Sequence, residues 1–338
     1  MNRWVLILLP SIFLFGFGAA ELSQTRIEIR YPSNWPKPNY DFEKKPLYKN
    51  RVELGRKLFY DPVLSGNGMV SCASCHLSFT AFTHVDHALS HGINDSIGTR
   101  NAPVLINLAW NKLFMWDGAV NNIEVQALAP ISHASEMGND LITLLPKLNE
   151  HDTYPALFKT AFGEEKIASK QLLLALAQFQ LTLVSANSKY DKVKAGVLKF
   201  TEQEANGYKL FQQNCNGCHK EPLFTTTEFE NNGLQPDANL RDSGRYQVTR
   251  LSKDLFKFKV PTLRNIQYSF PYMHDGRYNN LNEVLNHYRA DQELNIINHQ
   301  NKPVIEITEH QKVDLIAFLL TLSDREFLFN PDYGFPRN

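Results

Sequence analysis

Two copies of the motif Cys-x-x-Cys-His, at residues 72–76 and 215–219, constrain this chain more than any other feature. They use all four of its cysteines. The spacing suits covalent attachment of c-type haem, because two thiols add to the porphyrin vinyl groups while the adjacent histidine reaches the iron. Structural zinc sites and thioredoxin-like dithiols also use Cys-x-x-Cys pairs. Here, however, the pairs are remote in sequence and His follows each at once, so we predict two haem c groups. They would be attached through Cys72, Cys75, Cys215 and Cys218, with His76 and His219 as iron ligands.

The first twenty residues have the composition of a secretory signal peptide. A short basic start precedes an almost wholly apolar run from Trp4 to Phe17, and small residues follow at 18–20. A retained membrane anchor is the alternative, but the run is short for a span and Pro10 interrupts it. Because haem c is attached outside the cytoplasm, export agrees with the two motifs. We expect residues 1–20 to be cleaved, leaving a periplasmic protein with no membrane contact and no structural disulfide.

Charge and length narrow the class of protein further. The chain has 35 Lys and Arg residues against 35 Asp and Glu residues, so nothing predicts binding to nucleic acid, and a redox partner would need a local patch. A chain of 338 residues predicts two domains. We expect an N-terminal haem domain over residues 21–190, which begins with an extended proline-rich arm, and a C-terminal haem domain over residues 191–338.

Helical signals dominate the rest of the sequence. Apolar spacing over 52–59, the Leu- and Ala-rich run 169–186, and capping boxes that begin at Thr201 and Thr308 predict helices. Strand-like alternation is scarce. We therefore predict a mostly α fold of two cytochrome-c-like haem domains with long loops and little β structure. A Leu-Phe pair before each motif suggests an internal duplication, and no further repeat is identified.

Six stretches around the motifs resemble the bacterial di-haem cytochrome c peroxidase superfamily, which includes MauG. In chain order they are LGRKLFYDP (54–62), SCASCH (71–76), TRNAP (99–103), WDG (116–118), LRN (263–265) and PYMHDG (271–276). They span roughly residues 50 to 325. The resemblance implies that peroxide reacts at the N-terminal haem, held by His76, and that the C-terminal haem, held by His219, collects oxidising equivalents.

The resemblance also implies roles for residues near the haems. Trp116 would relay electrons between them, and Glu136 would be the acid–base group of the peroxidatic pocket, which Gln126 and Pro130 help to shape. Such a group is needed because peroxide loses a proton on binding and its outer oxygen gains one on cleavage. Asn101, with the backbone carbonyls of Ser269 and Pro271, matches a calcium site made of oxygen ligands.

Two positions distinguish the subfamilies. Tyr288 stands where electron-accepting peroxidases place a Met ligand and MauG places Tyr, and Met273 is the alternative ligand here. A phenolate favours ferric iron, whereas a thioether favours ferrous iron. His91 resembles the histidine that caps the N-terminal iron in resting peroxidases, with His84 and His87 as neighbouring candidates.

Three functions follow as hypotheses. The first is an exported peroxidase that reduces hydrogen peroxide to water with electrons from a small cytochrome c or copper protein. The second is MauG-like oxidation of a protein or organic substrate through paired ferryl haems. Tyr288 favours this, although Gln213 replaces the surface Trp that MauG uses to pass holes outward. The third is a non-catalytic electron-transfer cytochrome. The sequence leaves the oligomeric state open; the resemblance is compatible with a homodimer, because relatives are often dimeric.

Overall fold

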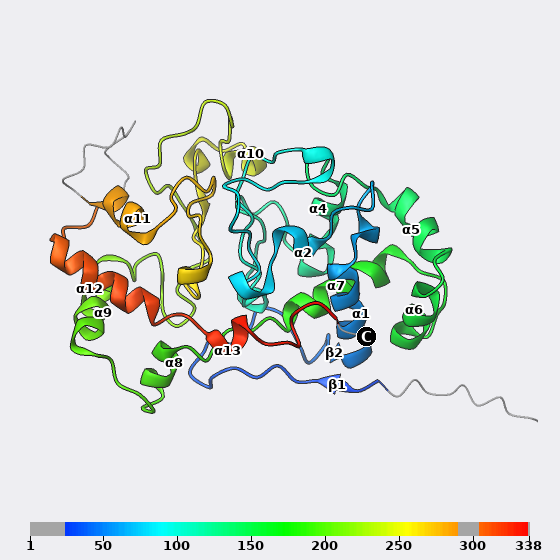
Figure 1. The fold of residues 1–338 in the computed structure, drawn as a ribbon, viewed down its shortest axis with the longest axis horizontal. Coiled ribbons are helices and arrows are strands. Elements are labelled where there is room, and N and C mark those ends of the chain that lie inside the picture. The colour runs from blue at the N-terminus through cyan, green and yellow to red at the C-terminus, as the bar shows by residue number, and fades with distance from the viewer. Residues whose placement is uncertain (1–23, 290–303, 337–338) are drawn as a thin grey trace, which may run out of the picture.

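The computed structural model describes residues 24–289 and 304–336, so the predicted signal peptide lies outside the described residues. Figure 1 shows two helical lobes side by side. In chain order the helices are α1 (Lys49–Tyr60), α2 (Cys72–Cys75), α3 (Ile123–Gln126), α4 (Leu128–Ser132), α5 (Leu141–Asn149), α6 (Tyr154–Phe162), α7 (Ser169–Leu181), α8 (Lys189–Lys194), α9 (Glu202–Asn214), α10 (Tyr246–Thr249), α11 (Leu281–Tyr288), α12 (Glu309–Leu320) and α13 (Arg325–Leu328). Strands β1 (Arg26–Ile27) and β2 (Leu47–Tyr48) pair antiparallel, as do β3 (Phe229–Glu230) and β4 (Phe258–Lys259). The mostly α fold is confirmed.

The predicted helix starts are confirmed where side chains cap them. The hydroxyls of Thr201 and Thr308 accept hydrogen bonds from the third residue of α9 and α12, and both capping boxes are complete. The run predicted as a helix over 169–186 ends earlier, with α7 at Leu181. The backbone N–H groups of Ser185 and Ala186 donate instead to Asn107 and Asp324, which draws the chain out of the helix.

Each lobe has its own hydrophobic core. The first is built mainly from α1 and from α3 to α7, and the second from α9, α11 and α12. The C-terminal part of the chain returns to the first lobe, because Phe327 and Leu328 of α13 pack into the first core. In Figure 1 the N-terminal arm runs along the lower edge of the molecule under both lobes. The arm and α13 therefore fasten the lobes together from opposite ends of the chain.

A glycine sets the main helix crossing in each lobe. A Cβ atom at Gly55 of α1 would overlap the carbonyl oxygen of Ala175 in α7, and one at Gly207 of α9 would overlap the carbonyl oxygen of Asp314 in α12. Without side chains at these points the backbones approach closely. Four residues further on, each helix places a phenylalanine against its partner. The ring centroids are 5.3 Å apart for Phe59 with Phe179, and 5.1 Å apart for Phe211 with Phe318.

We expect Gly55→Ala and Gly207→Ala each to destabilise their lobe by about 1–3 kcal/mol, because the added methyl meets backbone that cannot rotate away. The loss would occur although alanine is the better helix former. Urea unfolding of the haem-loaded protein measures it. Gly334→Ala is the matched control, since its added Cβ would meet only Pro331 at an ordinary 3.6 Å. Unchanged midpoints for both helix variants would contradict the close crossings.

The structure shows a repeat that the sequence reading missed. Residues 99–131 align without a gap on residues 257–289, and the turns at Met115-Trp116-Asp117-Gly118 and Met273-His274-Asp275-Gly276 have matching left-handed residues. The two halves also bond reciprocally. Asn101 N–H donates to the carbonyl of His274, and Lys259 N–H to that of Trp116, both at 2.7 Å. Since Asn101 aligns with Lys259 and Trp116 with His274, the lobes meet like the subunits of a two-fold symmetric dimer.

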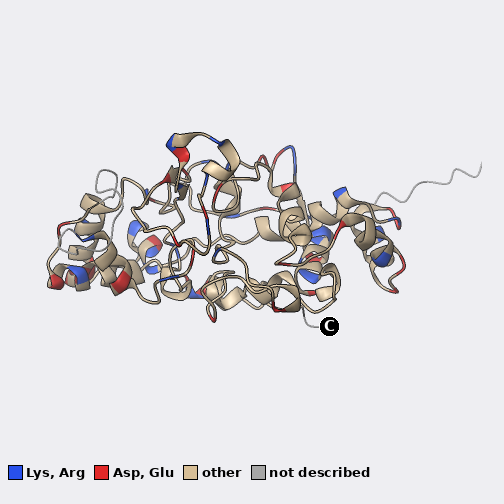
Figure 2. Cartoon of the chain, turned by 90° about the horizontal axis from the view of Figure 1, so that it is seen from above, with Lys and Arg blue, Asp and Glu red and all other residues tan. Residues whose placement is uncertain are grey.

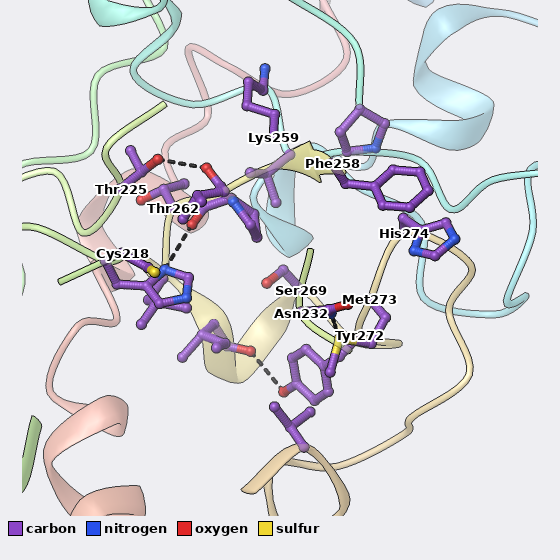
Figure 3. A pocket seen from close by; sticks show the side chains of 18 of the residues that line it. Cys218, Thr225, Asn232, Phe258, Lys259, Thr262, Ser269, Tyr272, Met273 and His274 are labelled. Atoms are coloured by element: carbon purple, nitrogen blue, oxygen red, sulfur yellow. Dashed lines mark hydrogen bonds between the residues drawn. The ribbon is translucent and has the colours of Figure 1, made fainter. Parts of the chain in front are cut away.

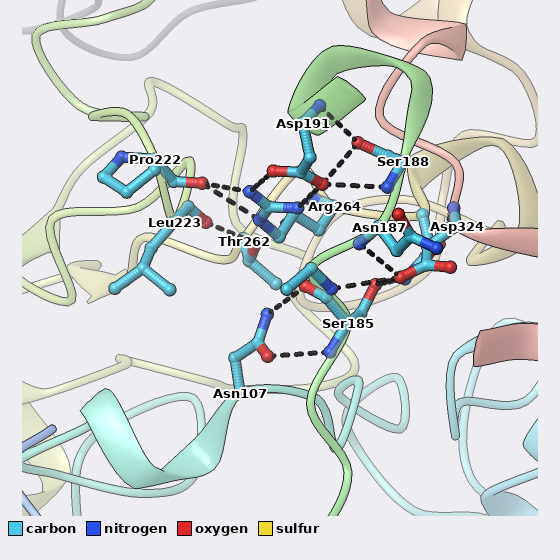
Figure 4. A network of polar contacts seen from close by, with 12 residues as sticks. Asn107, Ser185, Asn187, Ser188, Asp191, Pro222, Leu223, Thr262, Arg264 and Asp324 are labelled. Atoms are coloured by element: carbon cyan, nitrogen blue, oxygen red, sulfur yellow. Dashed lines mark hydrogen bonds and ion pairs between the residues drawn. The ribbon is translucent and has the colours of Figure 1, made fainter. Parts of the chain in front are cut away.

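Polar networks reinforce this contact between the lobes. Asp324 accepts hydrogen bonds from Ser185, Ala186 and Asn187 at 2.9–3.3 Å, and Asn265 donates to the Ser185 hydroxyl at 2.9 Å (Figure 4). Across the contact, Arg100 of the first lobe pairs with Asp242 of the second at 2.6 Å. Elsewhere, charges of both signs are spread over the length of the molecule (Figure 2). Among the described residues, no helix is both long and apolar enough to cross a membrane.

Candidate di-haem site

The first Cys-x-x-Cys-His motif lies at the edge of the first core. Cys72 and Cys75 begin and end α2, and His76 follows directly. The Nδ1 atom of His76 lies 2.7 Å from the carbonyl oxygen of Phe82. Burial lowers the pKa of His76 to about 4, which keeps the imidazole neutral at neutral pH. With Nδ1 held by a carbonyl, Nε2 is the atom left to bind iron.

The second motif repeats this arrangement. Helix α9 ends at Asn214, directly before Cys215. Nδ1 of His219 lies 3.3 Å from the carbonyl oxygen of Phe224 and 3.1 Å from that of Pro261. Burial also lowers the pKa of His219. Phe82 and Phe224, which provide equivalent carbonyls, both have left-handed backbones. In both motifs the backbone thus holds Nδ1 of the histidine that is predicted to bind iron.

A cavity of about 310 Å³ adjoins the second motif. Cys215, Cys218 and His219 line it on one side, and Tyr288 and Met273 also contribute to its wall. Figure 3 shows this cavity from close by, with Asn232 beside Met273. Most of the lining is apolar, as a porphyrin face requires. The residues present therefore fit a haem attached at Cys215 and Cys218.

Tyr288 lies at the end of α11 and faces the cavity. Burial is the main cause that raises its pKa to about 12; a hydrogen bond with Asn232 acts in the opposite direction, and the nearby thiols of Cys215 and Cys218 add to the effect of burial. Asn232 also donates to the sulfur of Met273 at 3.3 Å. The fold thus brings both predicted distal ligands, Tyr288 and Met273, to one cavity. A positive charge such as that of ferric iron would favour the phenolate here, in addition to the hydrogen bond with Asn232.

The repeat gives Tyr288 a counterpart in the first lobe. The aligned residue is Pro130 in α4, which has no side-chain atom that could bind iron. Gln126, at the end of α3, donates to the sulfur of Met115 at 3.8 Å. Both residues lie on the short helices after the Trp116 turn. The first lobe therefore has no counterpart, at the equivalent place, of the predicted ligand Tyr288.

Glu136 lies close to the first motif. Burial raises the pKa of both Cys72 and Cys75, and the charge of Glu136 adds to this effect. Burial raises the pKa of Glu136 itself above 4.5, and His133, 3.9 Å away, partly offsets this. The side chain still keeps 40% of its surface exposed, so it is open to a small reactant. A partly buried carboxyl with a raised pKa is suited to exchanging protons.

Trp116 lies where the lobes meet. Its indole N–H donates to the carbonyl of Asn101 at 2.8 Å, and its ring borders the cavity. The side chain of the partly buried Lys259 lies nearby and donates to the carbonyl of Leu113 at 3.2 Å. Burial lowers the pKa of Lys259 to about 8. Trp116 is therefore held by backbone contacts from both lobes.

The three predicted calcium ligands line the same cavity. These are Asn101, Ser269 and Pro271. The side-chain amide of Asn101 donates to the carbonyl of Ala88 at 3.0 Å, which leaves its oxygen as the atom for a cation. Within residues 24–289 and 304–336 there is no cluster of three His, Cys, Asp or Glu side chains that could hold a metal. Calcium would therefore depend on neutral oxygen ligands.

The histidines after the first motif stack on one another. The ring centroids of His84 and His87 are 5.0 Å apart, and those of His87 and His91 are 4.0 Å apart. His91 also lies next to the motif, because its carbonyl accepts a hydrogen bond from the Cys75 thiol at 3.4 Å. Nδ1 of the buried His84 has no hydrogen-bond partner. The loop thus places all three predicted candidates beside the first haem-attachment site.

Three residues of the site were missed from the sequence. His274 stacks on Phe258 with ring centroids 3.6 Å apart, and burial lowers its pKa to about 4. Asn232 joins the two predicted distal ligands. Lys259 is a partly buried cation at the lobe contact. An alignment of the chain with itself would have found His274 and Lys259 as counterparts of Trp116 and Asn101, whereas no sequence signal marks Asn232.

Comparisons with known proteins agree with this geometry. A family model described as di-haem cytochrome c peroxidase matches residues 49–199, and one described as cytochrome c matches residues 204–323. The methylamine utilization protein MauG of Methylorubrum extorquens is 34% identical over 313 residues, which cover 89% of this chain and 85% of that protein. Cytochrome c551 peroxidase of Nitrosomonas europaea is 31% identical over 299 residues, covering 86% and 84%.

A solved structure extends the comparison to the fold. The crystal structure of a MauG-like protein associated with microbial copper homeostasis matches with a TM-score of 0.80 and 30% identity, covering 90% of this chain and 98% of that one. Both cytochrome c motifs lie within the matched regions. The chain therefore belongs to the di-haem cytochrome c peroxidase and MauG superfamily, and it is a haem c protein of that family.

Proposed function

We propose that this protein is an exported di-haem peroxidase, which reduces hydrogen peroxide to water with electrons from a small cytochrome c or copper protein. The observation that carries the proposal is the difference between the lobes at one aligned position, Pro130 against Tyr288. In the first lobe Glu136 lies beside the motif and Pro130 offers no atom that could bind iron, whereas the second lobe offers a phenol in its cavity. Bound haem would supply the iron at which peroxide is reduced and the oxidising equivalents are stored.

The residues around the first motif would then handle protons. Glu136 takes the proton that peroxide loses on binding and returns it to the outer oxygen, which leaves as water. Its raised pKa keeps a larger share of protonated carboxyl near neutral pH than an ordinary glutamate would have. Trp116, held between the lobes, would carry electrons from the second lobe to the first. Gln126 and Pro130 would border the peroxide pocket.

A second candidate is MauG-like oxidation of a protein or organic substrate. It is supported by Tyr288 in the second-lobe cavity and by relatives named MauG. Gln213 speaks against a protein substrate, because it is an exposed residue of α9 that cannot be oxidised. Both candidates use the same peroxide chemistry and differ in what supplies the electrons.

We expect Tyr288→Phe to change the ligand field of the second haem. In wild type the phenolate would give a six-coordinate ferric signal in low-temperature EPR, and the phenylalanine variant would lose it because no oxygen replaces the ligand. Met273→Leu is the matched control and should leave the signal unchanged, although Met273 borders the same cavity. Peroxide turnover with a small cytochrome c, measured in parallel, tests the function. Loss of the signal in Met273→Leu alone would assign the ligand to Met273.

The proposal also includes a metal ion, a location in the cell and a resting ligand for the first iron. We propose one Ca²⁺ held by Asn101, Ser269 and Pro271, a periplasmic location after removal of residues 1–20, and a resting His91 cap on the first iron. We also retain the haem domains over residues 21–190 and 191–338 as predictions, and the resemblance stays compatible with a homodimer. The shared cavity wall supports the calcium site, and the contact between His91 and Cys75 supports the cap.

A further inference from the structure

Three aromatic side chains connect the N-terminal arm to the first lobe. The ring centroids of Tyr31 and Trp110 are 5.2 Å apart, and those of Trp35 and Trp110 are 5.1 Å apart, both edge to face. Backbone contacts fix this arrangement, since the Trp110 indole N–H donates to the carbonyl of Pro36 at 2.7 Å. The side chain of Asn39 donates to the carbonyl of Trp110. The arm is therefore shaped around Trp110.

Trp110 also borders the cavity of the second motif. The lining of that cavity also includes Leu223, Leu263 and His219. Trp110 itself is only 4% exposed, whereas Tyr31 is half-buried and so reaches the surface of the protein. A continuous series of rings thus leads from the cavity to the surface, in two steps. Indole and phenol are the side chains that lose and regain single electrons most readily.

Two rings contact Trp110, those of Trp35 and Tyr31, and the nearby charges make Tyr31 the better site for a lost electron. The guanidinium of Arg264 lies over the ring of Trp35, 4.5 Å from its centroid. That contact is attractive while the ring is neutral, but it becomes repulsive once the ring has lost an electron. Within the described residues, no Lys or Arg lies over the ring of Trp110 or Tyr31 in this way. Trp35 is thus a poor site for a hole, and Trp110 and Tyr31 are better ones.

We propose that Trp110 and Tyr31 form a one-electron route between the surface and the second-lobe cavity, and that a redox protein delivers its electrons at Tyr31. This inference rests on the proposed peroxide chemistry. Trp110 gives one electron toward the cavity and is re-reduced by Tyr31, which releases its phenolic proton to water. Tyr31 then regains one electron from the donor and one proton from water. Two such passages supply the two electrons that, with two protons, convert hydrogen peroxide to two waters.

Radical trapping tests the route without relying on turnover. The haem-loaded full-length protein is mixed with hydrogen peroxide and a nitroso spin trap in the absence of donor, and adducts are located by peptide mass spectrometry. We expect the adduct at Tyr31 in wild type. Trp110→Phe should lower it severalfold because phenylalanine is too hard to oxidise, and Tyr31→Phe should shift it to Trp110. Tyr31 is half-buried, so its variant keeps the test valid if Trp110→Phe fails to fold.

Two further variants serve as controls. Tyr40 lies on the same arm, but its ring pairs with Phe42 and its hydroxyl donates to Glu124 at 3.1 Å. Tyr40→Phe should therefore leave the adduct at Tyr31 unchanged, as should Trp35→Phe. Peroxide consumption with adducts only elsewhere, for example at Trp116, would overturn the route and leave the proposed function intact. Absence of any reaction with peroxide would overturn both.

Discussion

Replacing Glu136 by glutamine is expected to lower the rate of peroxide cleavage by about 10²–10⁴-fold, because glutamine can neither accept nor return a proton. Haem content and the iron signals should stay as in wild type, since Glu136 has no role in attachment. Stopped-flow mixing with hydrogen peroxide measures the step directly. Glu150→Gln, an exposed glutamate at the end of α5, is the matched control and should react like wild type.

The pH dependence gives a second readout for Glu136. Its pKa is raised above 4.5, so the carboxylate that accepts the proton is fully available only at a higher pH than for an ordinary glutamate. The rate of peroxide reaction should therefore rise with pH through this raised pKa in wild type. In Glu136→Gln that rise should disappear. A variant that keeps both the rate and its pH profile would favour the non-catalytic electron-transfer hypothesis.

Local signals in the sequence predicted most of the fold. The capping boxes at Thr201 and Thr308 need only residues three positions apart, and the structure confirms both. The two haem motifs are equally local, because attachment residues and axial histidine lie within five positions. The family resemblance rests on such short stretches and is confirmed by the comparisons.

What the sequence reading missed depends on contacts between distant residues. The repeat is weak because few aligned residues are identical, and its meaning lies in reciprocal backbone bonds such as that between Lys259 and Trp116. The early end of α7 depends on Asn107 and Asp324, which reach it from other parts of the chain. The roles of Glu136, Trp116 and Tyr288 in the site remain predictions. The variants Glu136→Gln and Tyr288→Phe test two of them.

The buried ion pair between Arg264 and Asp191 is expected to be the most sensitive point of the second lobe. Arg264 is fully buried, and its guanidinium donates to both carboxylate oxygens of Asp191 at 2.8 and 2.9 Å (Figure 4). It also donates to the carbonyl of Pro222 at 2.7 Å. Asp191→Asn would leave this positive charge without a counter-ion. We expect a loss of about 3–5 kcal/mol, because an unpaired buried charge cannot recover its hydration.

Acid should reproduce the effect in the wild-type protein. The guanidinium holds the pKa of Asp191 below its ordinary value of 3.8 even though burial acts to raise it. A depressed pKa in the folded state means that the pair stabilises the protein above the unfolded pKa and that this contribution is lost as pH falls through the folded value. The difference in urea midpoint between wild type and Asp191→Asn should therefore be large at pH 7 and shrink below about pH 4.

A surface pair on the same helix provides the control. Lys192, one residue after Asp191, pairs with the exposed Glu326 at 3.0 Å. Glu326→Gln should leave the urea midpoint unchanged within error, because water replaces the lost contact. Since Arg264 also lies over Trp35, the Asp191 variant should loosen the arm, and its Trp fluorescence should change before the second lobe unfolds. Equal shifts of the urea midpoint in Asp191→Asn and Glu326→Gln would contradict the expectation that burial strengthens the pair between Arg264 and Asp191.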